Sequence, residues 1–437
     1  MVAKNKDAQA ILDKLGIAAL NPMQESAQAV ITSDAEVVLL SPTGTGKTLA
    51  FLLPIIAALD PELSAVQVLI LVPSRELAIQ IEQVIREMGS GHKANAVYGG
   101  RAGYKDRVEL KHPPALLIGT PGRVADHIRR ENVDTHHIKT LVLDEFDKSL
   151  EIGFAEDMKE IIAALPSLKR KVLTSATQKV AIPPFVGIRN ATQLNFLDRS
   201  DSLLQLQTVI SPTKDKLPTL IQLLRHVGKR NGMVFCNFKE SIQTVSEALD
   251  KAQVAHGCFH GGLEQIDRER SLIKFRNGTY SLLVATDLAA RGIDVPEMDF
   301  IVHYELPHSE AEFVHRNGRS ARMHSDGTAY VLQWEQTTLP PFIKGAEEIA
   351  LTTKKQDLSS SWVTLYISGG RKDKISKGDV AGLFFKQGGL TKDELGIIEL
   401  KQDCTYVAVP QSKSTKLIAQ LNNTRLKTKK VRISQLA

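Results

Sequence analysis

The residues with the clearest chemical potential lie between Ser41 and Thr48, where the chain reads Ser-Pro-Thr-Gly-Thr-Gly-Lys-Thr. Its glycines let backbone N–H groups turn toward a polyphosphate, while Lys47 supplies a positive charge and Thr48 a hydroxyl ligand for Mg²⁺. An apolar run at 37–40 precedes the segment and a helical pattern at 49–59 follows it, and a helix N-terminus favours an anion. A plain glycine turn is the alternative, because Ser41 stands where glycine is usual, but this setting favours a nucleotide site.

A short acidic segment, Asp144-Glu145-Phe146-Asp147, follows another apolar run at 141–143. Carboxylates at the end of a strand suit Mg²⁺, so Asp144 is expected to hold the ion through its water shell. Glu145 is expected to orient the water that attacks the γ-phosphate. Alone, this segment would more often be a solvated acidic turn; together with the phosphate-binding loop it predicts a catalytic site.

Two segments in the second half of the chain, 286–294 and 315–322, combine arginine with glycine. Arg319 and Arg322 are three residues apart, a spacing that can place both on one helical face. Guanidinium groups that reach a nucleotide from across a cleft neutralise the charge developing on the transferred phosphate. Arginines on a helix are more often a solvated face, and the nucleotide site elsewhere in the chain is what favours a catalytic role.

These residues need a framework of strands and helices to position them. Strand-like runs fall near 37–40, 68–72, 115–118, 141–143 and 171–174, then near 233–236, 255–259, 281–285, 300–304 and 328–333. Because helical patterns alternate with these runs, we expect an α/β fold of two tandem domains, each a parallel sheet with helices on both faces. The domains are placed at 1–200 and 201–351, joined by the polar stretch from Asp198 to Lys216, and a flexible linker is expected at 352–361.

Residues 362–437 form a third domain with its own pattern. Strands are expected near 363–367, 397–400, 405–409 and 430–433, and helices near 377–385 and 413–422. The order β-α-β-β-α-β is that of an RNA-recognition motif (RRM), an α+β topology that many proteins without RNA also share. The aromatic-rich signature of that motif is missing, with only Tyr406 on the third strand, so stacking of several bases on the sheet is not expected.

The positive charge of the chain is confined to this last domain. The formal net charge is +6, but residues 362–437 contain 14 Lys and Arg against six Asp and Glu, or +8. The rest of the chain contains 41 basic against 43 acidic residues. A neutral body with a basic terminal domain indicates an anionic partner at that domain, with nucleic acid the leading candidate.

Length and composition set the remaining bounds. A chain of 437 residues that is 43% hydrophobic can bury the cores of two or three domains. Cys236, Cys258 and Cys404 show neither disulfide nor zinc spacing, which fits a reducing cytoplasm. The N-terminus lacks an apolar signal core, and no apolar stretch is long enough to cross a bilayer. We therefore expect a cytoplasmic protein that does not bind membranes, and nothing in the sequence requires more than a monomer.

From about Gly16 to Gln333 the chain resembles the DEAD-box RNA helicases. Besides the segments above, further stretches follow the order of that family: Pro73-Ser74-Arg75-Glu76-Leu77-Ala78, Gly99-Gly100, Thr120-Pro121-Gly122-Arg123, Ser175-Ala176-Thr177, Gln265 to Arg268 and Phe275-Arg276-Asn277-Gly278. The resemblance implies two RecA-like domains, remodelling of RNA, and ATP and Mg²⁺ as cofactors.

The resemblance also implies a role for each matching residue. Gln24 would read the adenine edge and Asp294 would touch the sugar, and the phosphates would lie in the loop formed by Thr43, Gly44, Thr45, Gly46, Lys47 and Thr48. Thr48 and Asp144 would hold the metal, and the catalytic set would be Lys47, Asp144, Glu145, Arg319 and Arg322.

Other matching residues would couple nucleotide to RNA. The coupling set is Asp147, Ser175, Thr177 and His315. The set that grips the RNA backbone is Arg75, Gly100, Thr120, Arg123 and Thr286. Contacts to phosphates and 2′-OH groups select RNA geometry without reading its sequence.

Several positions depart from the family pattern. Phe146 replaces the usual alanine and should be accommodated by repacking, because both neighbouring carboxylates are kept. Asn317 stands where an aliphatic residue is usual and Ala321 where glycine is usual, so the loop with the two arginines could differ. No Phe, Tyr or Trp precedes Phe51 to stack on adenine, and Leu20-Asn21 replaces the usual Pro-Thr.

The mechanism implied is a cleft that closes when ATP and RNA bind together and reopens on hydrolysis. RNA held by its backbone and bent would be pried apart locally. An ATP-gated RNA clamp or scaffold with little unwinding is the alternative, motivated by Ala321 and the missing aromatic. A DNA helicase is disfavoured by the RNA-type segments.

The last domain resembles the terminal RNA-binding domain of the DbpA branch of this family. The resemblance lies in the stretch from Gly369 to Val380, in Tyr406-Val407-Ala408-Val409 and in the stretch from Lys427 to Arg432. It implies a target in 23S rRNA or its large-subunit precursor. Arg371, Lys372, Lys374 and Lys430 are the expected contacts, although each lysine singly could be an ordinary solvated residue.

Overall fold

The computed structural model describes residues 8–100, 103–177, 181–197, 204–287, 298–320, 327–352 and 358–436. The chain forms two compact units that divide between Ser202 and Leu203. Across the described ranges, no helix has the length and apolar character needed to span a membrane.

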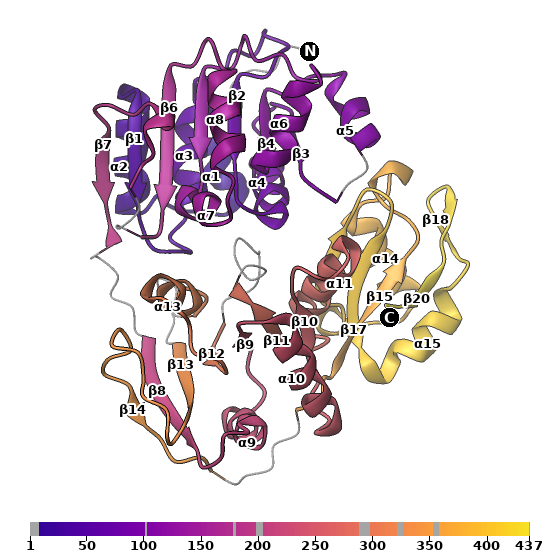
Figure 1. The fold of residues 1–437 in the computed structure, drawn as a ribbon. Helices are drawn as coiled ribbons and strands as arrows, with labels where there is room; N and C mark the ends of the chain where they lie inside the picture. The colour runs from indigo at the N-terminus through magenta and orange to yellow at the C-terminus, as the bar shows by residue number, and fades with distance from the viewer. Residues whose placement is uncertain are drawn as a thin grey trace. The chain divides into compact units, whose positions relative to one another are not determined.

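A parallel seven-stranded sheet forms the centre of the first unit (Figure 1). Its order is β3-β4-β2-β5-β6-β1-β7, with bounds β1 Glu36–Leu40, β2 Val68–Leu71, β3 Ala94–Val97, β4 Leu116–Gly119, β5 Thr140–Leu143, β6 Arg170–Ser175 and β7 Thr192–Asn195. The helices are α1 Ala8–Leu15, α2 Pro22–Ser33, α3 Lys47–Ala57, α4 Arg75–Met88, α5 Gly103–Leu110, α6 Pro121–Arg129, α7 Phe146–Glu151 and α8 Ala155–Ala163.

Helices cover both faces of this sheet because its strands are apolar on both sides. Val37 and Leu39 of β1 belong to a core with α1 to α4, whereas Val38 and Leu40 belong to a core with α6 and α8. Strands buried on two faces read as continuous apolar runs. The predicted parallel sheet is therefore confirmed, while the short strands β3 and β7 were not predicted.

The second unit contains another parallel seven-stranded sheet. Its order is β10-β11-β9-β12-β13-β8-β14, with bounds β8 Leu204–Ser211, β9 Gly232–Cys236, β10 Gly257–Phe259, β11 Leu282–Thr286, β12 Phe300–His303, β13 Gly327–Trp334 and β14 Glu347–Glu348. The helices are α9 Leu217–Val227, α10 Lys239–Lys251, α11 Gln265–Arg276 and α13 Glu310–Asn317.

One stretch expected to be a linker is part of this sheet. Strand β8 lies within the stretch from Asp198 to Lys216 and pairs along its whole length with β13. The prediction of a linker was therefore wrong for 204–211. The alternation Leu204-Gln205-Leu206-Gln207 is typical of a half-buried strand, and its polar members masked that signal.

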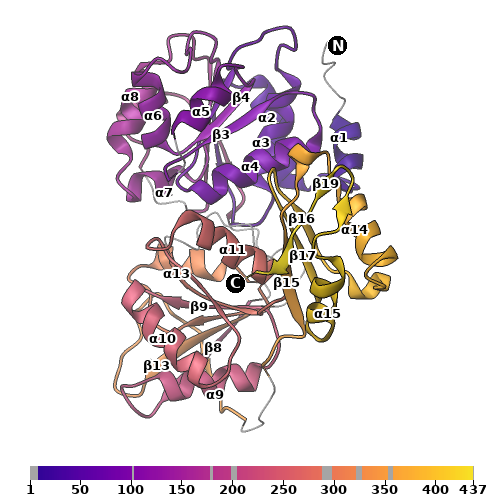
Figure 2. The ribbon, with the colours of Figure 1, turned by 90° about the vertical axis from the view of Figure 1, so that its right-hand side faces the viewer.

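The second unit also holds a smaller antiparallel sheet with two helices, visible in Figure 2. Its order is β16-β17-β15-β20, with bounds β15 Trp362–Ile367, β16 Ile398–Leu400, β17 Thr405–Pro410 and β20 Ile433–Gln435, and the helices are α14 Lys377–Lys386 and α15 Gln411–Leu421. The predicted β-α-β-β-α-β order is confirmed. The last strand was placed too early, because Lys429–Lys430 forms β19, which pairs with β18 at Arg425–Leu426.

Candidate functional site

The loop between β1 and α3 has the geometry of a phosphate cradle. Gly44 and Gly46 have φ of 81° and 86°, a region that favours glycine. Lys47 Nζ donates to the carbonyl oxygens of Ser41 (2.6 Å) and Pro42 (2.7 Å), so the ammonium lies within the loop's curve. The Ser41 hydroxyl, which stands where glycine is usual, hydrogen-bonds the Thr45 hydroxyl at 2.8 Å and closes the same turn.

The predicted adenine-reading residue, Gln24, is tied to this loop. Its Oε1 accepts from the backbone N–H of Asn21 (3.0 Å), and its Nε2 donates to the Gly46 carbonyl (3.3 Å). Asn21 caps α2 in return and its Nδ2 donates to the Thr45 carbonyl (3.0 Å). A Cβ at Gly46 would lie 2.4 Å from Gln24 Nε2, which gives that glycine a second function. The start of α2 and the phosphate loop are thus one hydrogen-bonded unit.

The acidic residues lie at the end of β5, beside that loop. Asp144 is buried, and burial raises the pKa of its carboxyl group, while the Thr174 hydroxyl and Lys47 act in the opposite direction. Thr174 donates to Asp144 Oδ1 and accepts from the Glu145 N–H at 3.1 Å, so one hydroxyl positions both acids. Glu145 has φ of 48°, which is unusual for a residue with a side chain.

This set of donors fits a magnesium ion. A buried carboxylate whose charged form is disfavoured by burial gains from a nearby cation, and the Thr48 hydroxyl at the start of α3 would be a second hard oxygen ligand. Thr174 was not predicted. Its signal was a polar residue within the apolar run of β6, but its partners are 29 and 30 positions away in sequence.

Three of the four residues predicted to couple the nucleotide site to RNA, Asp147, Ser175 and Thr177, are linked by hydrogen bonds in the first unit. Thr177 Oγ1 donates to Asp147 Oδ2 at 3.1 Å, and the Thr177 N–H donates to Ser175 Oγ at 2.9 Å. Phe146 is buried in the core shared with α6 and α8, so this core accommodates the larger ring.

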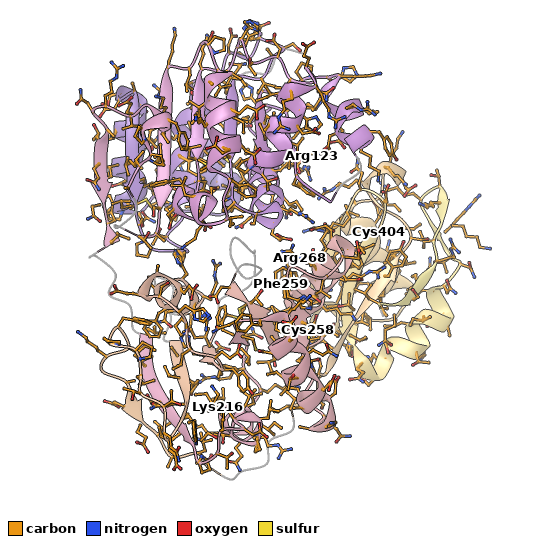
Figure 3. The ribbon with its side chains drawn as sticks, viewed as in Figure 1. Arg123, Lys216, Cys258, Phe259, Arg268 and Cys404 are labelled. Carbon is orange, nitrogen blue, oxygen red and sulfur yellow. The ribbon has the colours of Figure 1, made fainter. Side chains whose placement is uncertain are left out.

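The residues predicted to bind RNA in the first unit lie at the ends of three adjacent strands, β3, β4 and β2. Arg75 begins α4, and a Cβ at Gly100 would lie 2.5 Å from its Nη1. Gly100 has φ of 83°, a region that favours glycine. Thr120 is the N-cap of α6, and Arg123 is in its first turn (Figure 3). The phosphate loop and the acids follow β1 and β5 on the other half of the same edge.

Two residues that the sequence did not reveal hold Arg123 in place. Asp106 is fully buried, and its Oδ2 accepts from Arg123 Nε at 2.9 Å and lies 2.8 Å from Nη2. His127 Nε2 lies 3.2 Å from the same oxygen. These residues are separated by 17 and 21 positions, so no local spacing could indicate the cluster.

In the second unit, α13 carries His315 and leads into Arg319, and both side chains are buried. The adjacent Arg316 fixes this helix: it pairs with Asp287 (Nε to Oδ1, 2.8 Å) and donates to Asn237 Oδ1 (2.8 Å). Thr286 ends the neighbouring strand β11. Asp294, Ala321 and Arg322 lie outside the described residues. The spacing within 315–322 does not indicate this role of Arg316, because Asp287 is 29 positions away in sequence.

The unusual Asn317 has a specific partner. His303 Nε2 lies 3.0 Å from Asn317 Oδ1, and the imidazole packs between Phe235 and Phe313. Burial and the nearby Arg316 lower the pKa of His303 to about 3, so the ring is neutral. A neutral imidazole whose Nε2 carries the proton donates to the Asn317 carbonyl oxygen. A polar residue at 317 is therefore matched by a polar residue on β12.

The basic residues predicted on the last domain are exposed and come from two segments. Gly370 precedes Arg371 and Lys372, and a Cβ at Gly370 would lie 2.5 Å from the Gln402 carbonyl oxygen. Lys374 follows with φ of 58°, and Lys430 lies on β19. The two segments are joined by an ion pair between Lys429 Nζ and Asp373 Oδ2 at 2.8 Å.

The sheet face of this domain contacts α11 within the same unit. Arg276 forms a two-bond ion pair with Glu399, at 2.6 and 2.9 Å. Ile273 packs with Tyr406 and Leu436. Tyr406, the one aromatic expected on the third strand, is buried in this contact, which agrees with the expectation that bases do not stack in series on the sheet.

Comparisons with known proteins agree with this geometry. Residues 21–182 match the DEAD/DEAH box helicase family, 215–324 match the helicase conserved C-terminal domain, and 364–435 match the DbpA RNA binding domain. The chain is 33% identical to ATP-dependent RNA helicase DbpA of Escherichia coli, over 97% of this chain and 96% of that protein. ATP-dependent RNA helicase DbpA of Bacillus subtilis is 29% identical to the chain, also over 97% of this chain and 96% of that protein.

A solved structure shows the same likeness. Dbp5 of S. cerevisiae bound to RNA and ADP BeF3 is 26% identical, with a TM-score of 0.67 over 75% of this chain and 88% of that chain.

Proposed function

Because this chain belongs to the DEAD-box ATP-dependent RNA helicases and has a DbpA-type RNA-binding domain, we propose that it locally unwinds duplexes in 23S rRNA during assembly of the large ribosomal subunit. The observation that carries this proposal is the basic terminal domain, which matches the DbpA RNA binding domain over residues 364–435. Its charge is +8, against a slightly negative remainder. We place the enzyme in the cytoplasm as a monomer.

The first unit supplies the ATP site. Lys47 and the loop N–H groups would hold the phosphates, and Thr48 and Asp144 would hold Mg²⁺, which neutralises charge on the β- and γ-phosphates. Glu145 would orient the attacking water. Arg319 and Arg322 would stabilise the transferred phosphoryl group once RNA and ATP have closed the two domains, and hydrolysis would release the RNA.

The proposed rRNA target is tested by the ATPase rate of the full chain with large-subunit rRNA and with an equal mass of unstructured homopolymer RNA. Strong stimulation by rRNA alone is the expected result, because the terminal domain raises the local concentration of the core beside its target. Equal stimulation by both RNAs would refute rRNA as the specific target but would remain consistent with helicase activity. No stimulation by either would favour the ATP-gated clamp.

Replacing Thr174 by valine should raise the Mg²⁺ concentration that hydrolysis requires, most strongly at acidic pH. The hydroxyl lowers the pKa of Asp144, so its removal raises that pKa and protonates the metal-binding carboxylate at higher pH. A hydrogen bond to a charged group contributes about 1.5–3 kcal/mol, so the Mg²⁺ concentration for half-maximal hydrolysis should rise about tenfold or more.

Thr208→Val is the matched control for this substitution. Thr208 is also a buried strand residue, and its hydroxyl has no hydrogen-bond partner within the described ranges. Magnesium titrations at pH 6 and pH 8 should separate the two variants. Equal magnesium requirements at both pH values would show that Thr174 does not support Asp144.

A further inference from the structure

We propose that the ring of Phe238, supported by His308, is a platform on which one base of bound RNA stacks. The inference rests on the proposed function, because it requires RNA on the second unit. It adds a contact to a base where the matching family residues imply contacts only to the RNA backbone.

Phe238 lies on the edge of the sheet where RNA is expected. It follows β9 by two residues, and the last residue of β9, Cys236, is in register with Thr286 at the end of β11. Because parallel strands end at one edge of a sheet, Phe238 lies beside the position predicted to grip the backbone. Gly261 and Gly262, after β10, continue the same edge, and a Cβ at Gly262 would lie 3.8 Å from Lys239 Cδ.

Neither packing nor local structure accounts for phenylalanine at this position. The residue is 58% exposed, so it contributes little to the core. Phe238 is the N-cap of α10 and makes no side-chain capping hydrogen bond. Serine, threonine, aspartate or asparagine would stabilise the helix there by roughly 1 kcal/mol. An aromatic residue that lowers helix stability and faces solvent is expected where a ligand covers it.

The neighbouring groups hold the two rings in place. The centroids of Phe238 and His308 are 6.4 Å apart, with an interplanar angle of 60°. Asn237 Nδ2 donates to the Leu306 carbonyl (3.0 Å) and lies 3.1 Å from His308 Nε2. The His308 N–H donates to Glu312 Oε2 at 2.7 Å. The platform is therefore fixed to α13, and Asn237 Oδ1 also accepts from Arg316.

The charge around the rings suits a nucleotide. Lys239 is 66% exposed at the positive end of α10, although Glu240 lies 3.7 Å from its Nζ. An aromatic ring for a base beside a cation for its phosphate is the usual composition of a single-strand binding surface. A protein partner would need an interface of roughly 1,000 Å² or more, whereas one ring and its histidine neighbour form a much smaller apolar surface.

The test measures RNA affinity in the presence of a non-hydrolysable ATP analogue, by fluorescence anisotropy. The probes are a single-stranded oligonucleotide and a set of versions with one abasic nucleotide at successive positions. Phe238→Ala should weaken binding of the intact RNA about 5- to 150-fold, the value of one stacked base. Phe238→Trp should bind as well as the unaltered protein. One abasic position should weaken binding by the unaltered protein but add no further loss in Phe238→Ala.

Phe385→Ala is the control, because Phe385 is also an exposed phenylalanine (38%) and lies on α14. The RNA affinity of this variant should equal that of the unaltered protein. Normal affinity of Phe238→Ala would overturn the inference, as would an additional loss at every abasic position. If the unaltered protein binds none of the RNAs, the proposed function fails first, and the two failures are therefore distinguishable.

Discussion

Replacing Glu145 by glutamine should lower RNA-stimulated ATP hydrolysis by roughly 10²- to 10⁴-fold, the usual contribution of a general base. Glutamine keeps the size of the side chain but cannot accept a proton from the attacking water. The backbone at Glu145 has φ of 48°, at a cost of roughly 1–2 kcal/mol, and its N–H is held by Thr174. This backbone conformation sets the direction in which the side chain of Glu145 leaves the chain, next to the buried Asp144. Replacing glutamate by glutamine does not change the backbone conformation.

Glu131→Gln is a close control for this experiment. Glu131 has the same residue type and a similar φ of 55°, and it lies in the same unit after α6. The hydrolysis rate of the Glu131→Gln variant should equal that of the unaltered protein. Glu145→Gln should still bind RNA in an ATP-dependent manner, and with longer lifetimes, because the closed state is not released. A rate within tenfold of normal would contradict the role given to Glu145.

Replacing Arg319 by alanine should reduce the rate of hydrolysis by roughly 10³- to 10⁵-fold, the range measured for arginines that stabilise phosphoryl transfer. The backbone of Arg319 is fixed, because its N–H donates to the Arg316 carbonyl (3.1 Å) and its carbonyl accepts from Met298 (3.2 Å). The backbone that carries the guanidinium group is therefore held in a defined position after α13. Single-turnover hydrolysis at saturating RNA measures the loss directly.

Arg319→Lys separates charge from geometry in the same experiment. Lysine keeps the charge but not the planar pair of donors, so most of the loss should persist. Because Arg319 is buried, the thermal unfolding midpoint of both variants must be compared with that of the unaltered protein. Normal hydrolysis by a folded Arg319→Ala would show that another group stabilises the transition state.

The sequence predicted what depends on local spacing. The glycines at 44 and 46, the lysine that follows them and the acids after β5 are close in sequence, and strand, loop and helix patterns place them. Residues that act through distant partners could not be found this way. Thr174 reaches Asp144, Asp106 reaches Arg123 and Arg316 reaches Asp287, each across 17 or more positions.

The departures from the family pattern required the structure for a physical explanation. Asn317 was an unexplained substitution until His303, 14 residues earlier, proved to be its buried partner. Phe146 needed the surrounding core to show that a ring fits. The register of the last strand could not be judged from composition, because the basic residues of β19 and the strand-like residues of β20 form one continuous run.

The most direct test of the proposed function is ATP-dependent strand displacement on a short RNA duplex joined to a 23S rRNA fragment, compared with the same duplex alone. Faster displacement of the joined duplex, lost without ATP, is the predicted result. Failure to displace either duplex, with ATP-dependent RNA binding retained, would contradict unwinding and establish the clamp.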